Sequence, residues 1–233
     1  MNNLQKMGGF SALMEGIFYL LGMVFFLLVV DYTSIDDPLE KVALLVENQA
    51  IIYILDFFIY VVFGILLVVL AIALYERLKT SSPALMQVAT AFGIIWAGLV
   101  IASGMTANIG TAVVVELYSN DPAQAATVWQ AIEAVTNGIG GGNEIIGGLW
   151  TLLVSWAALR SGDFSRVMNY LGLVVGVAGI ASTIPALGEI GGMIFGLGQL
   201  VWFIWLGIAM LRSSATATAD NPEASVPQFR TTS

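Results

Sequence analysis

The sequence predicts an all-α membrane protein, a polytopic bundle of six transmembrane helices with both termini in the cytoplasm. Three observations carry this prediction. First, 58% of the 233 residues are hydrophobic and only 10% are charged, whereas about a quarter of a soluble domain is charged. Second, the mean hydropathy is +0.88. Third, long runs without any charged residue recur along the chain, and seven of the eight basic residues fall on one side of the six-span arrangement.

The charge-free runs locate the spans, because a helix needs about 20 apolar residues to cross the hydrocarbon core. Residues 80–115 contain no charged residue at all. Two shorter runs reach spanning length when each includes one acid, Glu15 or Glu144. Apolar runs such as residues 66–74 do not alternate with polar residues, which argues against a transmembrane barrel. The predicted spans are residues 8–30, 49–75, 85–115, 139–160, 166–184 and 190–211.

The distribution of charge tests the number of spans. Lys41 alone lies outside, and the positive-inside rule therefore places both termini in the cytoplasm. The first span is expected to act as an uncleaved anchor. Eleven of the 16 acids fall on the outer side. This acidic side attracts cations, or it only reflects that translocated loops avoid Lys and Arg. The basic residues placed inside are Lys6, Arg77, Lys79, Arg160, Arg166, Arg212 and Arg230.

One membrane domain is expected over residues 1–212, followed by a disordered cytoplasmic tail over 213–233 that is rich in Ser, Thr, Ala and Pro. The pair Asp121-Pro122 is a helix start signal, and it predicts a further helix over 122–137. This helix either lies at the outer membrane interface and turns into the fourth span, or continues as one long helix that projects outside. We favour the interfacial arrangement, with a helix break at Gly138, Gly140, Gly141 and Gly142.

Polar residues inside the predicted spans are the candidate functional residues, because an ionisable group in a membrane is costly. Glu15, Asp56, Glu144 and Glu189 form a candidate intramembrane ion site. Glu15 alternatively bonds a neighbouring helix, and the other three alternatively lie at interface depth, where water solvates them. Asn108 either bonds another helix or lines a polar path. The glycine-rich break is a further candidate, since a broken helix lines a cavity with free backbone groups.

The absence of His and Cys limits the chemistry. It excludes disulfides, Cys/His zinc sites and His- or Cys-ligated haem. We predict no catalytic, metal-binding or cofactor-binding residue, so the protein is not expected to be an enzyme. A net charge of −8 gives no indication of nucleic-acid binding. The expected partners are membrane lipids together with copies of this chain or another membrane protein, packed through small residues.

The last third of the chain is similar to a widespread family of bacterial six-helix membrane proteins that is catalogued as a domain of unknown function. The similarity covers about residues 145–212. It implies a six-helix protein of the bacterial inner membrane and no established activity, so no functional residue is transferred. The motifs that carry it are Leu149-Trp150-Thr151-Leu152-Leu153, Ala158-Leu159-Arg160-Ser161-Gly162, Tyr170-Leu171-Gly172-Leu173-Val174-Val175-Gly176 and Trp202-Phe203-Ile204-Trp205-Leu206-Gly207.

Two functions follow as hypotheses. The first is a small transport- or channel-like protein whose intramembrane carboxylates handle protons or cations, with a water-accessible path that joins at least two of Glu15, Asp56 and Glu144. The second is a non-catalytic accessory or scaffold subunit of a homo- or hetero-oligomeric membrane complex. The second predicts a flat face of small residues and no continuous cavity.

Overall fold

The protein is mostly helical in the part described by the computed structural model, residues 2–140 and 142–219, and that part contains no strand. The predicted all-α class is therefore confirmed. Two π-helices, η1 (Phe25–Val29) and η3 (Phe57–Val62), and two 3₁₀ turns, η2 (Tyr32–Ser34) and η4 (Pro185–Leu187), connect the α-helices. The α-helices are α1 (Asn2–Val24), α2 (Pro38–Glu47), α3 (Gln49–Asp56), α4 (Phe63–Leu78), α5 (Pro83–Tyr118), α6 (Pro122–Gly140), α7 (Gly142–Ser161), α8 (Arg166–Ala181) and α9 (Gly188–Ala219).

Within these described ranges, four helical segments are long and apolar enough to cross a membrane: Asn3–Val29, Gln49–Leu78, Pro83–Tyr118 and Pro185–Ser213. These segments show a membrane protein. The remaining two predicted spans correspond to α7 and α8. Helix α8 is apolar but has only 16 residues, fewer than the roughly 20 needed to cross the hydrocarbon core. The six-span count therefore stays a prediction.

Capping explains where several helices begin. The Asp37 side chain accepts a 2.9 Å hydrogen bond from the Leu39 amide at the start of α2, with Pro38 at the first helical position. The Asp121 side chain accepts a 2.9 Å bond from the Gln124 amide in the same way at the start of α6. Both caps use side-chain oxygens to satisfy amides that have no partner within the helix.

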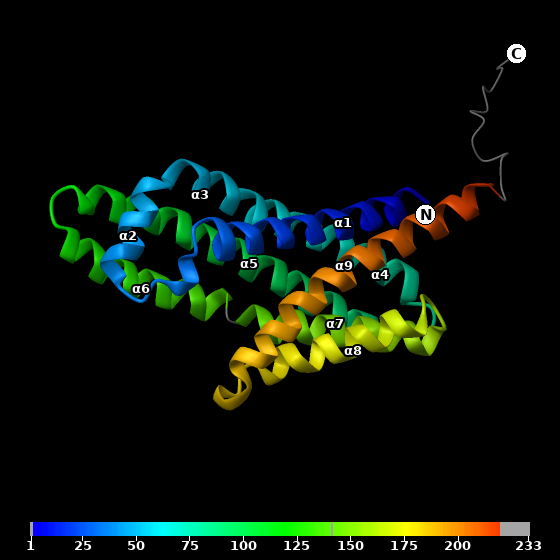
Figure 1. Cartoon of the computed structure of the whole chain (residues 1–233). Helices are drawn as coiled ribbons and strands as arrows, with labels where there is room; N and C mark the ends of the chain where they lie inside the picture. The colour runs from blue at the N-terminus through cyan, green and yellow to red at the C-terminus, as the bar shows by residue number, and fades with distance from the viewer. Residues whose placement is uncertain (1, 141, 220–233) are drawn as a thin grey trace, which may run out of the picture.

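Helices α6 and α7 together follow α5 in an antiparallel direction (Figure 1). The Ser103 hydroxyl of α5 donates a 3.1 Å hydrogen bond to the Thr136 carbonyl of α6. Further along, Gly93 of α5 lies against the Trp150 indole of α7. Gly93 precedes Ser103 by ten residues, whereas Trp150 follows Thr136 by fourteen, so α6 and α7 both run antiparallel to α5. The pairing with α5 continues from the end of α6 at Gly140 to the start of α7 at Gly142.

The favoured sequence prediction, in which the helix over 122–137 lies at the outer membrane interface and turns into the fourth span at the glycines, stays a prediction. Here α6 remains against α5, where Gly110 receives the Ile132 side chain. Helix α5 has 36 residues and is about 54 Å long at 1.5 Å per residue, against a hydrocarbon core of about 30 Å. The paired ends of α5 and α6 extend beyond most of the other helices (Figure 1). Gly138 and Gly140 lie in the last turn of α6, and Gly141 lies outside the described residues.

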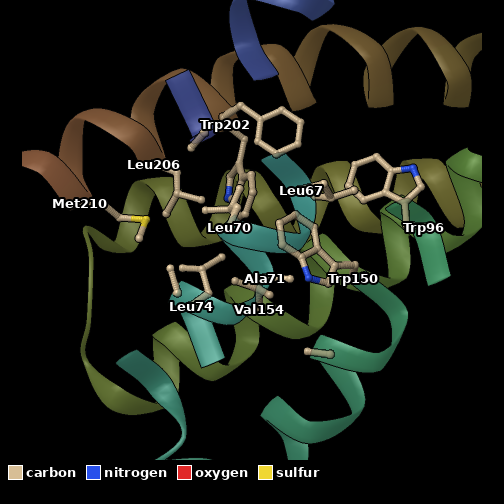
Figure 2. Close-up of a cluster of buried hydrophobic side chains, with 14 of the residues drawn as sticks. Leu67, Leu70, Ala71, Leu74, Trp96, Trp150, Val154, Trp202, Leu206 and Met210 are labelled. Carbon is tan, nitrogen blue, oxygen red and sulfur yellow. The ribbon is translucent and has the colours of Figure 1, made fainter. Parts of the chain in front are cut away.

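Two hydrophobic cores hold the helices together. The larger core contains three buried tryptophans, Trp96, Trp150 and Trp202, packed among leucines of α4 and α9 (Figure 2). The Trp150 and Trp202 rings meet edge to face at 5.6 Å. The smaller core joins α2 and α3 to the far ends of α5 and α6, and we call this group of four segments the cap. The buried residues of this smaller core are Phe25, Val42, Leu45, Ile52, Val114, Ala125 and Trp129.

Arg77 joins three elements at the opposite end of the molecule from the cap. Its guanidinium donates two 2.8 Å hydrogen bonds to the two carboxylate oxygens of Asp163, in the α7–α8 loop, and a 2.9 Å bond to the Ser213 hydroxyl of α9. The same guanidinium lies 4.4 Å from the centre of the Phe164 ring. This planar, bidentate arrangement suits arginine and not lysine.

Candidate functional site

A cavity of about 310 Å³ lies between the cap and the rest of the bundle. Its wall combines apolar side chains with two carboxylates, two tyrosines, two threonines and an asparagine. Residues from η1 to α6 contribute, so the wall is assembled from segments that lie far apart in the sequence. The lining residues are Phe26, Tyr32, Leu45, Ile52, Asp56, Tyr60, Ala107, Thr111, Trp129, Glu133, Thr136 and Asn137.

Asp56 is the buried carboxylate of this cavity. It is the last residue of α3, and η3 begins at the next position. Ile52 and Tyr60 lie four residues to either side and also line the cavity, as expected for one face of a continuous helical path. The residue is only 3% exposed. No donor of the described residues forms a hydrogen bond with its carboxylate.

The second carboxylate, Glu133, is already neutralised. Its Oε1 atom accepts a 2.9 Å hydrogen bond from Lys41 Nζ and a 2.8 Å bond from the Tyr32 hydroxyl. The Tyr32 oxygen in turn accepts a 2.9 Å bond from the Trp129 indole. Burial and the bond to Glu133 raise the pKa of the Tyr32 hydroxyl above its usual value. This four-residue network, which we call the Tyr32 network, leaves Asp56 as the carboxylate of the cavity without a compensating positive charge.

A second polar group of the wall also lacks a partner. The Thr136 hydroxyl is buried and forms no hydrogen bond with the described residues. Burying such a group without a partner is unfavourable. The cavity therefore presents an unpartnered carboxylate and an unpartnered hydroxyl, together with the rings of Tyr32, Tyr60 and Trp129. Carboxylates, hydroxyls and aromatic faces are the groups that bind cations.

The other four predicted site residues lie elsewhere. Glu15 of α1 is fully buried, and neither of its carboxylate oxygens has a partner of the described chain. Asn108 of α5 is half-buried, and its Oδ1 is buried without a described partner. Glu144 is half-buried in the first turn of α7, and Glu189 is exposed in the first turn of α9. None of these four lines the Asp56 cavity, so the structure does not bring the five predicted residues together.

Sequence reasoning missed most of the wall. Trp129, Glu133 and Thr136 recur at helical spacing along α6, and this pattern places them on one face. This helical spacing is the sequence signal that could have identified these three residues as one wall of a site. Tyr32 lies in the short 3₁₀ turn η2 and has no such pattern, so only the folded structure identifies it as the partner of Glu133.

The four long apolar helical segments of the described chain indicate an integral membrane protein built of α-helices. The chain belongs to the family described as domain of unknown function DUF4386, whose profile matches residues 14–209. This match confirms the predicted resemblance and extends it toward the N-terminus to include Asp56 and the Tyr32 network. Comparison with curated proteins gave no match, and comparison with solved structures gave none.

Proposed function

We propose that the protein is a transport- or channel-like protein of the bacterial inner membrane that binds and passes protons or cations at Asp56. The observation that carries the proposal is the Asp56 carboxylate, which is 3% exposed, faces a cavity of about 310 Å³ and has no described partner. A buried charge without a partner costs several kcal/mol. A bound proton or a bound cation lowers that cost, and we propose that the site holds one or the other.

Exchange between the two occupants follows from charge balance. When a cation binds the Asp56 carboxylate, the carboxyl proton leaves, and the net charge in the cavity stays the same. The Thr136 hydroxyl supplies an oxygen toward the cation. Glu133 remains bound to Lys41 throughout and does not compete for the cation. The proposal is therefore restricted to Asp56, because Glu15 and Glu144 do not line this cavity.

The proposed topology has six spans with the N- and C-termini inside, and the basic residues support it. Lys41, assigned to the outer side, belongs to the cap. Arg77, assigned to the cytoplasm, lies in the last turn of α4, and α4 lies toward the other end of the bundle (Figure 1). In this orientation the cap and the Asp56 cavity face outward. We propose a non-enzymatic role; a sequence without His or Cys lacks the imidazole base and the thiol nucleophile that many enzymes use.

The proposal is tested with the full chain in liposomes that contain the trapped pH dye pyranine. A potassium diffusion potential drives proton entry, and the assay is repeated with sodium and potassium gradients. Wild-type protein is expected to exceed protein-free liposomes, Asp56→Asn to fall to the protein-free rate, and Asp36→Asn, at an exposed position, to match wild type. Wild-type rates in Asp56→Asn, or no protein-dependent flux at all, would overturn the proposal.

A second candidate function is an accessory or scaffold subunit that assembles with copies of itself. One observation favours it: Gly192 and Gly196, four residues apart on α9, have no described atom within 4 Å of an added Cβ. Open small-residue positions at this spacing allow close helix packing in membranes. Native mass spectrometry of gently solubilised protein tests it. A persistent oligomer that dissociates in Gly192→Leu supports this role, and a monomer in the wild type excludes self-assembly.

A further inference from the structure

A second cavity, of about 250 Å³, borders the Asp56 cavity, and the two share Phe26 and Tyr60 in their walls. The second cavity is lined by apolar and aromatic residues, and no charged side chain of the described chain contributes to it. An apolar cavity of about 150 Å³ already stays dry and takes up benzene. The larger volume here is therefore suited to a hydrocarbon or aromatic group. Its wall includes Phe18, Tyr19, Met23, Ile59, Phe63 and Trp96.

We infer that the ligand of this protein is an organic cation with a hydrophobic body, bound with its positive group at Asp56 and its apolar body in the adjoining cavity. This inference rests on the proposed cation site at Asp56 and names the class of cation. Hydrated inorganic ions would leave the apolar cavity unfilled. A neutral apolar molecule would leave the Asp56 carboxylate without a partner.

The charges around the junction select a cation. Glu133 is bound to Lys41 at 2.9 Å, so Asp56 provides the uncompensated negative charge. Tyr60 lies at the boundary, in the walls of both cavities, where its ring face can receive an ammonium group. The proposed orientation of the ligand follows, because the carboxylate lines one cavity and the apolar side chains line the adjoining one.

The backbone around the two adjoining cavities is irregular in the way that often accompanies binding sites. Two π-helical segments of the described chain, η1 and η3, contribute the shared residues Phe26 and Tyr60. π-Helical turns are rare and are frequent at functional sites. In both segments the wider turn shifts the following side chains relative to a regular α-helix, and these are the segments that line the junction.

The wall of the apolar cavity also includes a residue whose hydrogen-bond donor has no described partner. The Trp96 indole N–H is buried and forms no hydrogen bond with the described residues. Trp96 belongs to the wall of the apolar cavity.

The experiment measures binding of radiolabelled decyltrimethylammonium to the full chain in nanodiscs, after subtraction of binding to protein-free nanodiscs. Tetramethylammonium provides the head group alone, and decanol the body alone. In the wild type, we expect decyltrimethylammonium to bind at least tenfold more tightly than tetramethylammonium and decanol to compete weakly. Asp56→Asn and the cavity-filling Ile59→Trp should each lower its affinity at least tenfold. Ile54→Trp, at a 59% exposed position of α3, should bind like wild type.

The outcomes separate this inference from the proposed function. If tetramethylammonium binding requires Asp56 but the decyl chain adds no affinity, or Ile59→Trp binds like wild type, the hydrophobic-body inference is overturned and the cation site stands. If decyltrimethylammonium binds Asp56→Asn as tightly as wild type, the inference is overturned as well. If, in addition, proton and cation flux are unchanged in Asp56→Asn, the proposed function also fails.

Discussion

The hydroxyl of Tyr32 donates a 2.8 Å hydrogen bond to Oε1 of Glu133, a residue 101 positions further along the chain. The bond connects η2, which directly follows the first long helix, to the middle of α6. Both residues line the Asp56 cavity. The Tyr32 network therefore links η2 and α2 to α6 beside the cavity, and it neutralises Glu133 at the same time.

Replacing Tyr32 with Phe is expected to destabilise the cap. The substitution removes one hydrogen bond to a carboxylate and leaves the Trp129 indole without its acceptor. Losing such a bond in a half-buried site costs about 1–3 kcal/mol. Amide hydrogen exchange should show faster exchange in α2 and the first half of α6 while α8 is unchanged. Tyr170→Phe, at a 58% exposed position, is the control. Equal exchange in Tyr32→Phe and wild type would contradict the role of the network.

The same network predicts a pH dependence. The raised pKa of Tyr32 means that the folded protein holds the phenolic proton more tightly than the unfolded chain. This contribution to stability is fully present below the unfolded pKa of about 10, and it is lost as the pH rises through the folded pKa. The stability difference between wild type and Tyr32→Phe should therefore shrink above about pH 10. A difference that is constant between neutral and alkaline pH would contradict this prediction.

Gly148→Ala is expected to disrupt the contact between α7 and α8. A Cβ at Gly148 would lie 2.7 Å from the Gly176 carbonyl oxygen and 3.1 Å from the Gly179 Cα. Both neighbours are backbone atoms, so the helices must separate. We expect a loss of about 1–3 kcal/mol, the usual cost of overpacking. Thermal melting in detergent measures it. Gly192→Ala is the matched control because an added Cβ there meets no described atom within 4 Å; equal melting temperatures for the two variants would refute the close approach.

Arg77→Lys is expected to weaken the end of the bundle opposite the cap although the charge is kept. Lysine cannot reproduce the bidentate bond to Asp163 together with the bond to Ser213. We expect a loss of about 1–2 kcal/mol in the free energy of unfolding. Denaturant unfolding in mixed micelles provides the measurement. Arg166→Lys, at an exposed position, should remain within about 0.5 kcal/mol of wild type; a similar loss in both variants would argue against the specific geometry of Arg77.

Glu15→Leu is expected to raise the thermal stability. Both carboxylate oxygens of Glu15 are buried without a described partner, and an apolar side chain of similar volume replaces them without that cost. Related replacements of buried ionic groups stabilise proteins by about 1–4 kcal/mol. Glu116→Leu, at an exposed position, should change stability by about 0.5 kcal/mol or less. A lower melting temperature for Glu15→Leu would show that the carboxyl group supports the fold.

The sequence predicts the helical class well because long charge-free runs leave few alternatives. It does not predict how the helices pair. The helix start at Asp121-Pro122 was recognisable, but the position of α6 depends on Gly110 and Ser103 of α5, which no local pattern links to it. Asp56 and Glu15 look alike in sequence, each a single acid in an apolar run. They differ only through tertiary packing, since one faces a cavity and the other is enclosed.

The central claim is that the Asp56 carboxyl group exchanges a proton for a cation. Infrared difference spectroscopy of the full chain in lipid tests it most directly, by comparing cation-free buffer with buffer that contains tetramethylammonium or sodium. The account predicts that cation binding removes a protonated-carboxyl C=O band in the wild type and in Glu15→Gln, and that this change is missing in Asp56→Asn. The same difference band in Asp56→Asn, or no carboxyl band change in the wild type, would contradict it.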